Sequence, residues 1–336
     1  MKDFLLEVLV CPSCGGKLVV SDARREGSEI ESGSLACACG RRYPVRNGIP
    51  RFVDKDGYVS NFSFEWGLFS KTQLDSFNGT RISEDRFREV VGSGADNLKG
   101  KVVLEAGCGM GRFLEVAARY GAEAIGVDLS FSVDSARENL KKYPNVNLVQ
   151  ADMFNMPFAE GRFDLVYSIG VIHHTPRPKE AFLRLVPLLS RNGAIAIWIT
   201  PRPKLSYLPR ATQIARFFTT RMDSNMLIRI IKKAVPLGLP LVRLPLAGGV
   251  LKGWVIPICD YKGRLPLSEE RLLEWSILDT FDLLSPRYLY SYTVKDVSGW
   301  VKEAGLSDMD TSSPEIIFRA RRTERHERDI RRHDQQ

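Results

Sequence analysis

The chain has 336 residues, of which 44% are hydrophobic and 26% charged, and its formal net charge is +8. This composition is ordinary for a soluble globular protein, and the length suits two or three folded units. No run of 18 or more uncharged apolar residues and no basic-then-apolar export signal occurs, so we expect a cytoplasmic protein.

Four of the six cysteines lie in residues 1–54, in two close pairs. Each pair, Cys11 with Cys14 and Cys37 with Cys39, is followed by glycine, and we expect short apolar strands to flank it. In a reducing compartment such pairs favour a metal site over disulfides, and four thiolates suit tetrahedral zinc. A module of this size lacks the core to fold alone, so we expect structural zinc; an empty site and a redox pair are the alternatives.

Residues 55–100 form a second unit that begins with several aromatic side chains and has a helical pattern over 86–91. Trp66 and Gln73 are candidates for closing over a substrate bound in the next unit. Ordinary packing of the aromatic run around Trp66 is the alternative.

Strands and helices alternate between residues 101 and 200. The expected strands are 102–106, 124–128, 146–150, 164–169 and 194–199. Helical patterns cover 112–120, 132–142 and 178–189. Runs of β-branched residues separated by helices indicate an α/β fold with a parallel sheet covered on both faces.

The first of these strands leads into a turn with three alternate glycines: Gly107, Gly109 and Gly111. Ligands of such sheets bind at the carboxyl ends of the strands, where glycines let the backbone approach them. Glu105 can accept from an ammonium group, Asp128 can bind ribose hydroxyls and Asp152 can receive an adenine amine. Because the spacing differs from the dinucleotide fingerprint, the ligand has no diphosphate; a plain strand–helix turn is the alternative.

Five segments together carry a resemblance: VVLEAGCGMGRF, GVDLS, QADMFNMPF, FDLVYSIGVIHHTPRPKEAFLRLVPLLSRNGAIAIWI and YTVKDVSGWVKEAGL. In this order they resemble the motifs of class I S-adenosylmethionine-dependent methyltransferases of the type-11 kind. The resemblance implies a Rossmann-like, doubly wound, seven-stranded and mostly parallel sheet. The N-terminal module, with RRYPVRNGIPRF, resembles the zinc-ribbon family of the small tRNA-methyltransferase activator subunit.

The resemblance also implies which residues hold the cofactor S-adenosylmethionine: Glu105, Gly107, Cys108, Gly109, Gly111, Asp128, Leu129, Asp152, Met153 and Ser168. His173 and His174 follow the fourth strand and are candidates for a base that takes a proton from a hydroxyl acceptor. Capping of their loop is the alternative. The NPPY-like run of amine methylases is missing here, and no cysteine stands at this strand end for pyrimidine C5 methylation.

Residues 201–290 interrupt the alternation with a basic and apolar insertion. Between 201 and 258, ten basic residues stand against one acid. Three interpretations are open: a lid over the acceptor pocket, an element that lies on anionic lipid, or a nucleic-acid-binding segment. Prolines at 236, 240 and 245 argue against a long recognition helix.

The alternation resumes over residues 291–322, which complete the core. We expect a helix closed by Gly305, followed by strands around 308–311 and 315–321. The tail 323–336 has no apolar face and is expected to be disordered.

These features predict a S-adenosylmethionine-dependent methyltransferase that modifies an oxygen or carbon of a small-molecule or lipid-linked acceptor. Arg287 and Tyr288 are further candidates for the acceptor side, with Trp66 and Gln73. Two alternatives stay open: an RNA base methyltransferase guided by the zinc ribbon and the basic insertion, and a non-catalytic cofactor-binding partner of another protein. The expected location is the cytoplasm, or the inner membrane face as a peripheral protein.

Overall fold

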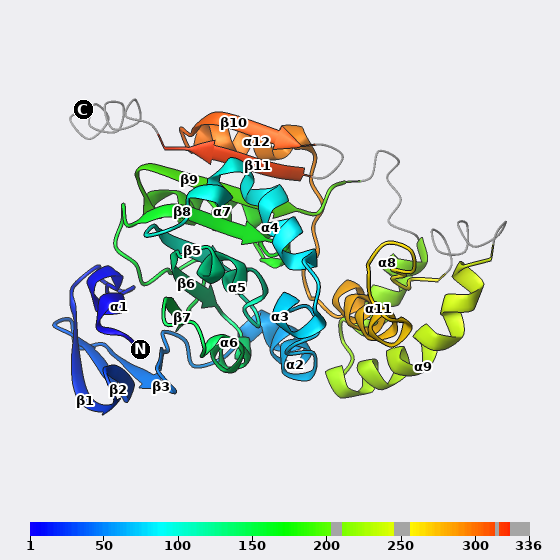
Figure 1. The fold of residues 1–336 in the computed structure, drawn as a ribbon, viewed down its shortest axis with the longest axis horizontal. Coiled ribbons are helices and arrows are strands. Elements are labelled where there is room, and N and C mark those ends of the chain that lie inside the picture. The colour runs from blue at the N-terminus through cyan, green and yellow to red at the C-terminus, as the bar shows by residue number, and fades with distance from the viewer. Residues whose placement is uncertain (203–209, 245–255, 313–315, 323–336) are drawn as a thin grey trace.

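The computed structural model describes residues 1–202, 210–244, 256–312 and 316–322 (Figure 1). An N-terminal module lies at one end of the molecule, a large sheet with its helices in the middle, and a group of helices at the other end. The tail 323–336, for which we expect disorder, lies outside the described residues.

The N-terminal module is an antiparallel sheet with strand order β1-β2-β3-β4, preceded by a short helix. Its elements are α1 (Asp3–Val8), β1 (Leu18–Glu26), β2 (Glu29–Cys37), β3 (Arg42–Arg46) and β4 (Ile49–Pro50). The expectation of a strand before the first cysteine pair is wrong, because Leu5 and Val8 form the buried side of a helix. A strand does precede the second pair, since β2 ends at Cys37.

This module shares its core with the large sheet. Leu5 and Leu35 belong to the same buried cluster as Phe158. The chain that leaves the module pairs in parallel with the edge of the large sheet at Arg51 and Gln150, and the Arg51 guanidinium donates to the Gln150 side chain at 3.0 Å. The module is therefore packed as part of one larger body.

The large sheet has seven strands in the order β10-β11-β9-β8-β5-β6-β7, which confirms the expected fold class. They are β5 (Val102–Ala106), β6 (Glu123–Asp128), β7 (Val146–Gln150), β8 (Phe163–Ile169), β9 (Leu189–Ile199), β10 (Ser307–Ser312) and β11 (Ile316–Arg321). Neighbours from β9 to β7 are parallel, and β11 is antiparallel to both β9 and β10. Because the chain moves one way from β5 and the other way from β8, the switch point lies between these strands.

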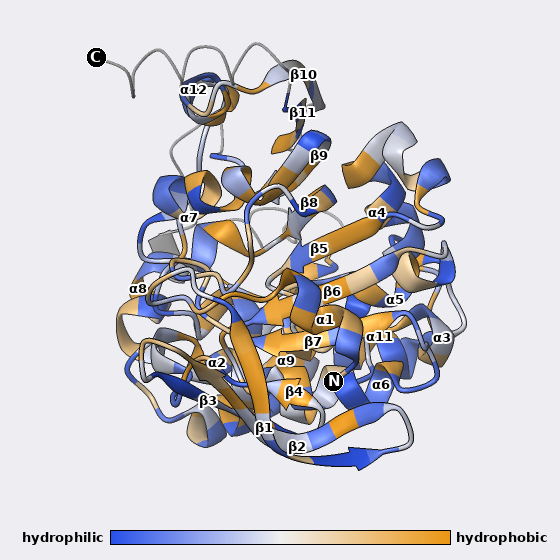
Figure 2. Cartoon of the chain, turned by 90° about the vertical axis from the view of Figure 1, so that its left-hand side faces the viewer, coloured by the Kyte–Doolittle hydropathy of each residue, from blue (hydrophilic) through white to orange (hydrophobic). Residues whose placement is uncertain are grey.

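Helices cover both faces of this sheet, and Figure 2 shows the hydrophobic strands β5 to β8 between them. One face carries α4 (Ile82–Val91), α5 (Arg112–Arg119) and α6 (Ser132–Leu140), whose Phe87, Leu114 and Leu140 are buried in one cluster. The other carries α7 (Pro178–Leu185) and α12 (Val294–Glu303), whose Phe182 and Trp300 are buried in the cluster that includes the N-terminal module. Short 3₁₀ turns are η1 (Gly57–Val59), η2 (Gly92–Asn97), η3 (Ile172–His174) and η4 (Val186–Leu188).

Helix α12 begins and ends at signals in the sequence. Thr293 and Asp296 form a reciprocal capping box, in which each side chain accepts from the backbone N–H of the other residue. Gly305 follows the helix with φ of +65°, a conformation that favours glycine. The expected helix closed by Gly305 is therefore present.

A third group of helices comes from the aromatic segment and the insertion. It consists of α2 (Ser60–Leu68), α3 (Asp75–Asn78), α8 (Arg210–Thr219), α9 (Ser224–Val242) and α11 (Glu269–Leu284). Phe69 from the first segment is buried with Ile231, Leu278 and Phe281 from the insertion. Helices α8 and α9 both contact α11, so α11 is the central helix of the group.

The expectation that prolines prevent a long helix is wrong for α9. Asp223 caps this 19-residue helix by accepting from the N–H groups of Asn225 and Met226, and Pro236 and Pro240 lie inside it. Both prolines are exposed, so water can reach the carbonyls that they leave without a donor. In the described part of the chain, none of the helices is both long and apolar enough to cross a bilayer.

Candidate functional site

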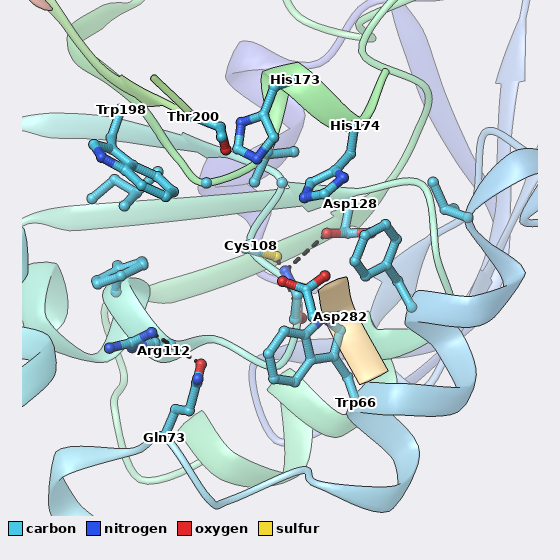
Figure 3. A pocket seen from close by; sticks show the side chains of 18 of the residues that line it. Trp66, Gln73, Cys108, Arg112, Asp128, His173, His174, Trp198, Thr200 and Asp282 are labelled. Carbon is cyan, nitrogen blue, oxygen red and sulfur yellow. Dashed lines mark hydrogen bonds between the residues drawn. The ribbon is translucent and has the colours of Figure 1, made fainter. Parts of the chain in front are cut away.

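A cavity of about 770 Å³ opens at the carboxyl edge of the large sheet, next to the switch point between β5 and β8. Its walls come from β5, β6 and β8 on one side and from α2 and α11 on the other. Figure 3 shows Trp66, Asp128, His173, His174 and Asp282 around the same space. The volume is typical of a small-molecule site.

The glycine turn after β5 brings the main chain to the cavity wall. Gly107 and Gly109 have φ of +86° and +50° and line the cavity. A Cβ on Gly109 would lie 3.2 Å from the Trp66 indole nitrogen, so a side chain there would narrow the site. Gly111 lies outside the cavity lining and lets α5 pack on α6, since a Cβ there would lie 2.6 Å from Leu140.

Glu105, the penultimate residue of β5, lies at the base of the cavity and is only 2% exposed. The Tyr167 hydroxyl donates to its Oε2 at 3.2 Å. Burial raises the pKa of the Glu105 carboxyl well above its usual range. A cation placed beside it would favour the ionised form, so the site suits an ammonium group.

Asp128 ends β6 and lines the same cavity. The Gly109 N–H donates to its Oδ2 at 2.8 Å, and the Ser130 N–H donates to its Oδ1 at 2.8 Å. Burial raises the pKa of this carboxyl. The Ser130 hydroxyl also donates to Oδ1, at 2.6 Å. These three hydrogen bonds fix the orientation of the carboxylate and leave one lone pair, on Oδ2, that can accept from a hydroxyl of a ligand.

Three further residues predicted to touch the cofactor also line the cavity: Cys108, Leu129 and Met153. Leu129 directly follows Asp128 and offers an apolar surface beside it. Burial raises the pKa of the Cys108 thiol well above its usual range, so this group stays a neutral thiol. Packing is therefore the role that its surroundings support.

Asp152 and Ser168 lie outside the cavity lining. Asp152 begins the turn after β7, where its carboxylate accepts from the Phe154 N–H at 3.0 Å. The Ser168 hydroxyl is fully buried and donates to the Ala106 carbonyl at 2.8 Å, which ties β8 to β5. In this structure both side chains support the strand ends beside the cavity.

His173 and His174 lie side by side in η3, with ring centroids 4.2 Å apart, and both line the cavity. The Nδ1 of His174 lies 3.0 Å from the Tyr288 carbonyl oxygen. Because a carbonyl only accepts, this nitrogen carries the hydrogen and Nε2 keeps the free lone pair. Burial lowers the pKa of both imidazoles, that of His174 to about 4, so both are neutral at pH 7.

Arg287 and Tyr288 lie beside the cavity, outside its lining. Arg287 is exposed, and its guanidinium lies 5.7 Å from the centre of the Tyr288 ring. Tyr288 acts on the site through its carbonyl, which orients His174. The three residues that follow Tyr288 do line the cavity.

Trp66 and Gln73, the other two substrate candidates, both line the cavity. The Gln73 side-chain oxygen accepts from Arg112 Nη1 at 3.0 Å, and its nitrogen donates to Asp279 at 3.2 Å. Gln73 therefore links a partly buried arginine of α5 to a partly buried acid of α11.

Helix α11 brings two acids to the cavity that sequence reasoning missed, Asp279 and Asp282. Asp279 accepts from Gln73 and Trp275, each at 3.2 Å, and from the Tyr261 hydroxyl. Asp282 Oδ1 is buried and has no hydrogen-bond partner within the described residues. Burial raises the pKa of both carboxyls to about 6. The signal was available, because two acids three residues apart interrupt the apolar run SILDTFDLL.

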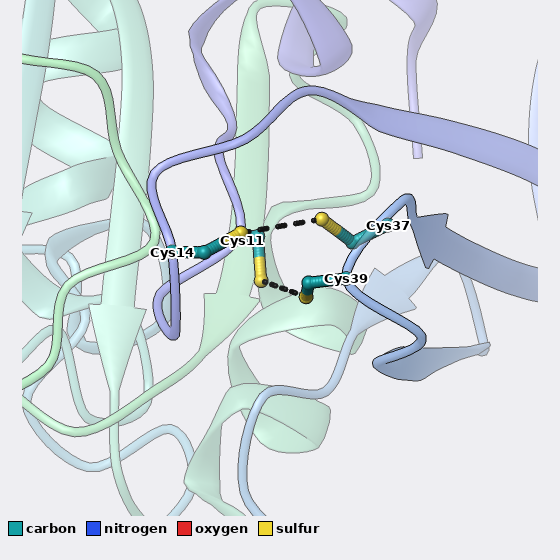
Figure 4. Close-up of side chains that lie close together, drawn as sticks. All are labelled: Cys11, Cys14, Cys37 and Cys39. Atoms are coloured by element: carbon teal, nitrogen blue, oxygen red, sulfur yellow. Dashed lines mark hydrogen bonds between the residues drawn. The ribbon is translucent and has the colours of Figure 1, made fainter.

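The four N-terminal cysteines come together at one end of their module (Figure 4). All four sulfurs lie within 4.8 Å of one another, with 3.8 Å between Cys11 and Cys39 and 3.5 Å between Cys14 and Cys37. In a tetrahedral zinc site with Zn–S bonds of about 2.3 Å the sulfurs are about 3.8 Å apart. The four thiols, including the tight Cys-x-Cys pair, are therefore arranged so that they could bind a metal ion.

Known proteins resemble parts of this chain. It is 40% identical over 99 residues to a malonyl-[acyl-carrier protein] O-methyltransferase of Legionella pneumophila, covering 28% of this chain and 34% of that protein. It is 31% identical over 113 residues to a ubiquinone biosynthesis O-methyltransferase of Coxiella burnetii, covering 33% of this chain and 48% of that protein. It is 26% identical over 166 residues to 24-methylenesterol C-methyltransferase 2 of Oryza sativa, covering 45% of each. The chain thus spans between about a third and a half of these relatives.

Among solved structures, magnesium protoporphyrin IX methyltransferase of Synechocystis with bound SAM aligns with a TM-score of 0.45 and 14% identity, over 81% of this chain and 98% of that one. Two family models match the sequence. Residues 104–197 match the model described as methyltransferase domain, and residues 2–48 match the one described as Trm112p-like protein. Residues 104–197 are therefore similar to known methyltransferase domains, and residues 2–48 are similar to Trm112p-like proteins.

Proposed function

We propose that this protein transfers a methyl group from S-adenosylmethionine to an oxygen or carbon of a small-molecule or lipid-linked acceptor. The observation that carries the proposal is the cavity at the switch point. Glu105 and Asp128 line it, and at Gly107 and Gly109 the lining is backbone without a side chain. An ammonium group fits Glu105, a ribose hydroxyl fits Asp128, and the apolar side chains of Leu129 and Met153 in the same lining fit an adenine ring. The relatives named above support the acceptor class, because their names describe O- and C-methyltransferases.

Methyl transfer here depends mainly on alignment. S-adenosylmethionine, when bound, supplies a methyl group on a positively charged sulfur that leaves as a neutral thioether. The residues of this chain then have to hold both partners in line and keep water out. Asp128, fixed by two backbone N–H groups, orients the ribose end, and Glu105 orients the amino-acid end.

The far wall of the cavity favours an acceptor with an apolar body and a hydrogen-bond donor. Trp275 and Leu278 of α11 supply apolar surface, while Asp282 keeps a buried oxygen without a partner among the described residues. A donor group on the acceptor would satisfy that oxygen. Such a polar headgroup on an apolar molecule is common to small aromatic and lipid-linked acceptors.

His174 is our candidate for the base when the acceptor is a hydroxyl. Its Nε2 is free, because Nδ1–H donates to the Tyr288 carbonyl. We expect His174→Gln to lower the rate of methyl transfer by about 100-fold or more, as general-base losses usually do. His173→Gln serves as the matched control and should cost much less, and equal losses in both variants would remove the base assignment.

We assign structural zinc to the cysteine cluster. Four thiolates fill a tetrahedral shell and leave no open position for a substrate. None of the six cysteines, all of which lie in the described residues, forms a disulfide, which supports the cytoplasmic location that we propose.

The acceptor class can be tested by incubating a cell extract with the protein and methyl-labelled S-adenosylmethionine, and then separating lipid, small-molecule, RNA and protein fractions. We expect label in the lipid or small-molecule fraction, and less of it with the Asp128→Ala variant at a limiting concentration of S-adenosylmethionine. Label in RNA would support the RNA methyltransferase alternative. Cofactor binding without label in any fraction would support a non-catalytic role.

A further inference from the structure

Helix α9 has two apolar faces, and only one of them is buried. Its inner face, with Leu227, Ile231 and Val235, packs in the core shared with α11. A second set of apolar side chains remains open to solvent: Met226 at 57%, Ile230 at 46%, Leu237 at 76% and Leu241 at 48% exposed. Exposed apolar side chains gathered in one place indicate an interaction surface.

The spacing of these four residues puts them on one side of the helix. They are separated by four, seven and four positions, which are close to whole turns of an α-helix. We call them the outer apolar line. Helix α8, which also contacts α11, has three exposed apolar side chains of its own: Ile214 at 63%, Phe217 at 60% and Phe218 at 62%. In Figure 1, α9 lies at the outer edge of the molecule.

Basic residues accompany this surface. Lys233 lies at the edge of the outer apolar line, three residues after Ile230 and four before Leu237. Arg229, four residues before Lys233, lies on the same side of the helix, and Lys232 lies on the other side. All three basic side chains are exposed, and none forms an ion pair with an acid of the described residues. The only acid between residues 210 and 244 is Asp223, which is used as the cap of α9. The surface is therefore apolar and cationic together.

A bilayer with anionic headgroups matches both properties. Apolar side chains gain by entering the boundary between headgroups and acyl chains, and each nearby lysine or arginine is attracted by anionic lipid. The prolines limit how deeply α9 can enter the bilayer. The carbonyls of Lys232 and Pro236 lack helical donors because Pro236 and Pro240 have no N–H, so these carbonyls need water or headgroups.

We propose that α9 forms a docking surface for anionic membrane, with the outer apolar line entering the headgroup region and Arg229 and Lys233 contacting the lipid phosphates. The proposal does not depend on methyl transfer, since docking requires neither cofactor nor acceptor. It does place the cavity close to the lipid, because α9 packs on α11, and Trp275, Asp279 and Asp282 of α11 line the cavity.

The test is co-sedimentation of the full-length, zinc-loaded protein with vesicles of phosphatidylcholine, with and without phosphatidylglycerol. We expect binding only when phosphatidylglycerol is present, and less of it at high salt. The double variant Leu237→Gln/Leu241→Gln should weaken binding by about tenfold or more. Arg229→Gln/Lys233→Gln should weaken it by about tenfold.

The controls change equally exposed residues elsewhere. Val19→Gln, at a side chain that is 61% exposed on β1, and Lys302→Gln, on the exposed side of α12, should bind vesicles like the wild type. Because every substitution is at an exposed position, the melting temperature serves as the check that all variants fold. The proposal is wrong if the wild type does not bind anionic vesicles or if the α9 variants bind as well as the controls. A concentration-dependent dimer that Leu237→Gln/Leu241→Gln dissociates, without vesicle binding, would show that this surface joins two copies of the chain.

Discussion

Glu105 is a buried carboxyl whose protonation should change when the cofactor binds. In the empty cavity burial favours its neutral form, and an ammonium group beside it would favour the ionised form. Binding of S-adenosylmethionine should therefore release a proton from Glu105, and affinity should fall as the pH is lowered. Calorimetry in two buffers of different ionisation enthalpy measures this proton release.

The matched variant for this prediction is Glu105→Gln, which keeps the shape but cannot ionise. It should bind the cofactor more weakly and release fewer protons than the wild type. Other buried groups in the cavity contribute equally to both proteins, so the difference isolates Glu105. Identical proton release in the two proteins would show that Glu105 does not face the ammonium group.

Replacing Asp282 with a neutral residue should make the fold more stable. Its pKa is raised by burial to about 6, above the 3.8 of an exposed aspartate, so at neutral pH the fold holds an unfavourable buried charge. Asp282→Asn should raise the free energy of unfolding by about 1–3 kcal/mol at neutral pH. Asp279→Asn should lower it, because Asp279 accepts from three side chains and an amide can accept with only one oxygen.

The stability gain of Asp282→Asn should depend on pH in a defined direction. As pH falls from about 6 to about 4, the wild-type carboxyl takes up its proton in the folded state and the advantage of Asp282→Asn should disappear. Burial lowers the pKa of His174 to about 4, so this residue makes the fold less stable as the pH falls over the same range. This effect is equal in both proteins. Melting temperatures of both proteins across this range provide the measurement, and a stability gain that grows at low pH would contradict the account.

Local signals in the sequence were enough for the cofactor half of the site. Glu105, Gly107 and Asp128 lie at strand ends, and parallel strand ends meet at one edge of a sheet, so their proximity follows from the alternation of strands and helices. Asp282 reaches the same cavity from an insertion more than 150 residues later. Its position depends on how α11 packs, which no local pattern specifies.

At the scale of elements, the zinc site that we propose for the N-terminal module leads to a prediction on metal removal. The module shares a buried cluster with the large sheet, so its loss of order should weaken the sheet edge at β7 as well. Chelation should lower the melting temperature by about 5–10 °C, and zinc should restore it. A Cys39→Ser variant should melt at the lower temperature and ignore the chelator, whereas a wild type unaffected by the chelator would contradict a structural metal.

Two elements differ from what their sequences suggest, for different reasons. The segment around Leu5 and Val8 is short and apolar, and such a run is compatible with a strand or a helix until its packing partner is known. In α9 the prolines remove two hydrogen bonds, but the inner face buries a long apolar stripe and the exposed prolines leave the freed carbonyls to solvent. Tertiary packing therefore decides both elements.

At the scale of the whole molecule, the sequence was sufficient for the order of units and the sheet type. Strand–helix alternation defines a doubly wound sheet, and the antiparallel pair at its edge follows from the last helix and two strands. The arrangement of the insertion was beyond sequence reasoning, because α11 lies between the cavity and α9 through long-range contacts. That arrangement connects the proposed reaction with the proposed membrane surface.

The central claim is that a sulfonium nucleoside occupies the cavity with its ribose on Asp128. Isothermal titration of zinc-loaded protein with S-adenosylmethionine and with its demethylated product tests this most directly. We predict one site per chain for each ligand, and at least about tenfold weaker binding by Asp128→Ala, as expected for the loss of hydrogen bonds to a charged group. No uptake of either ligand by the wild type, or equal affinity in the variant, would contradict the account.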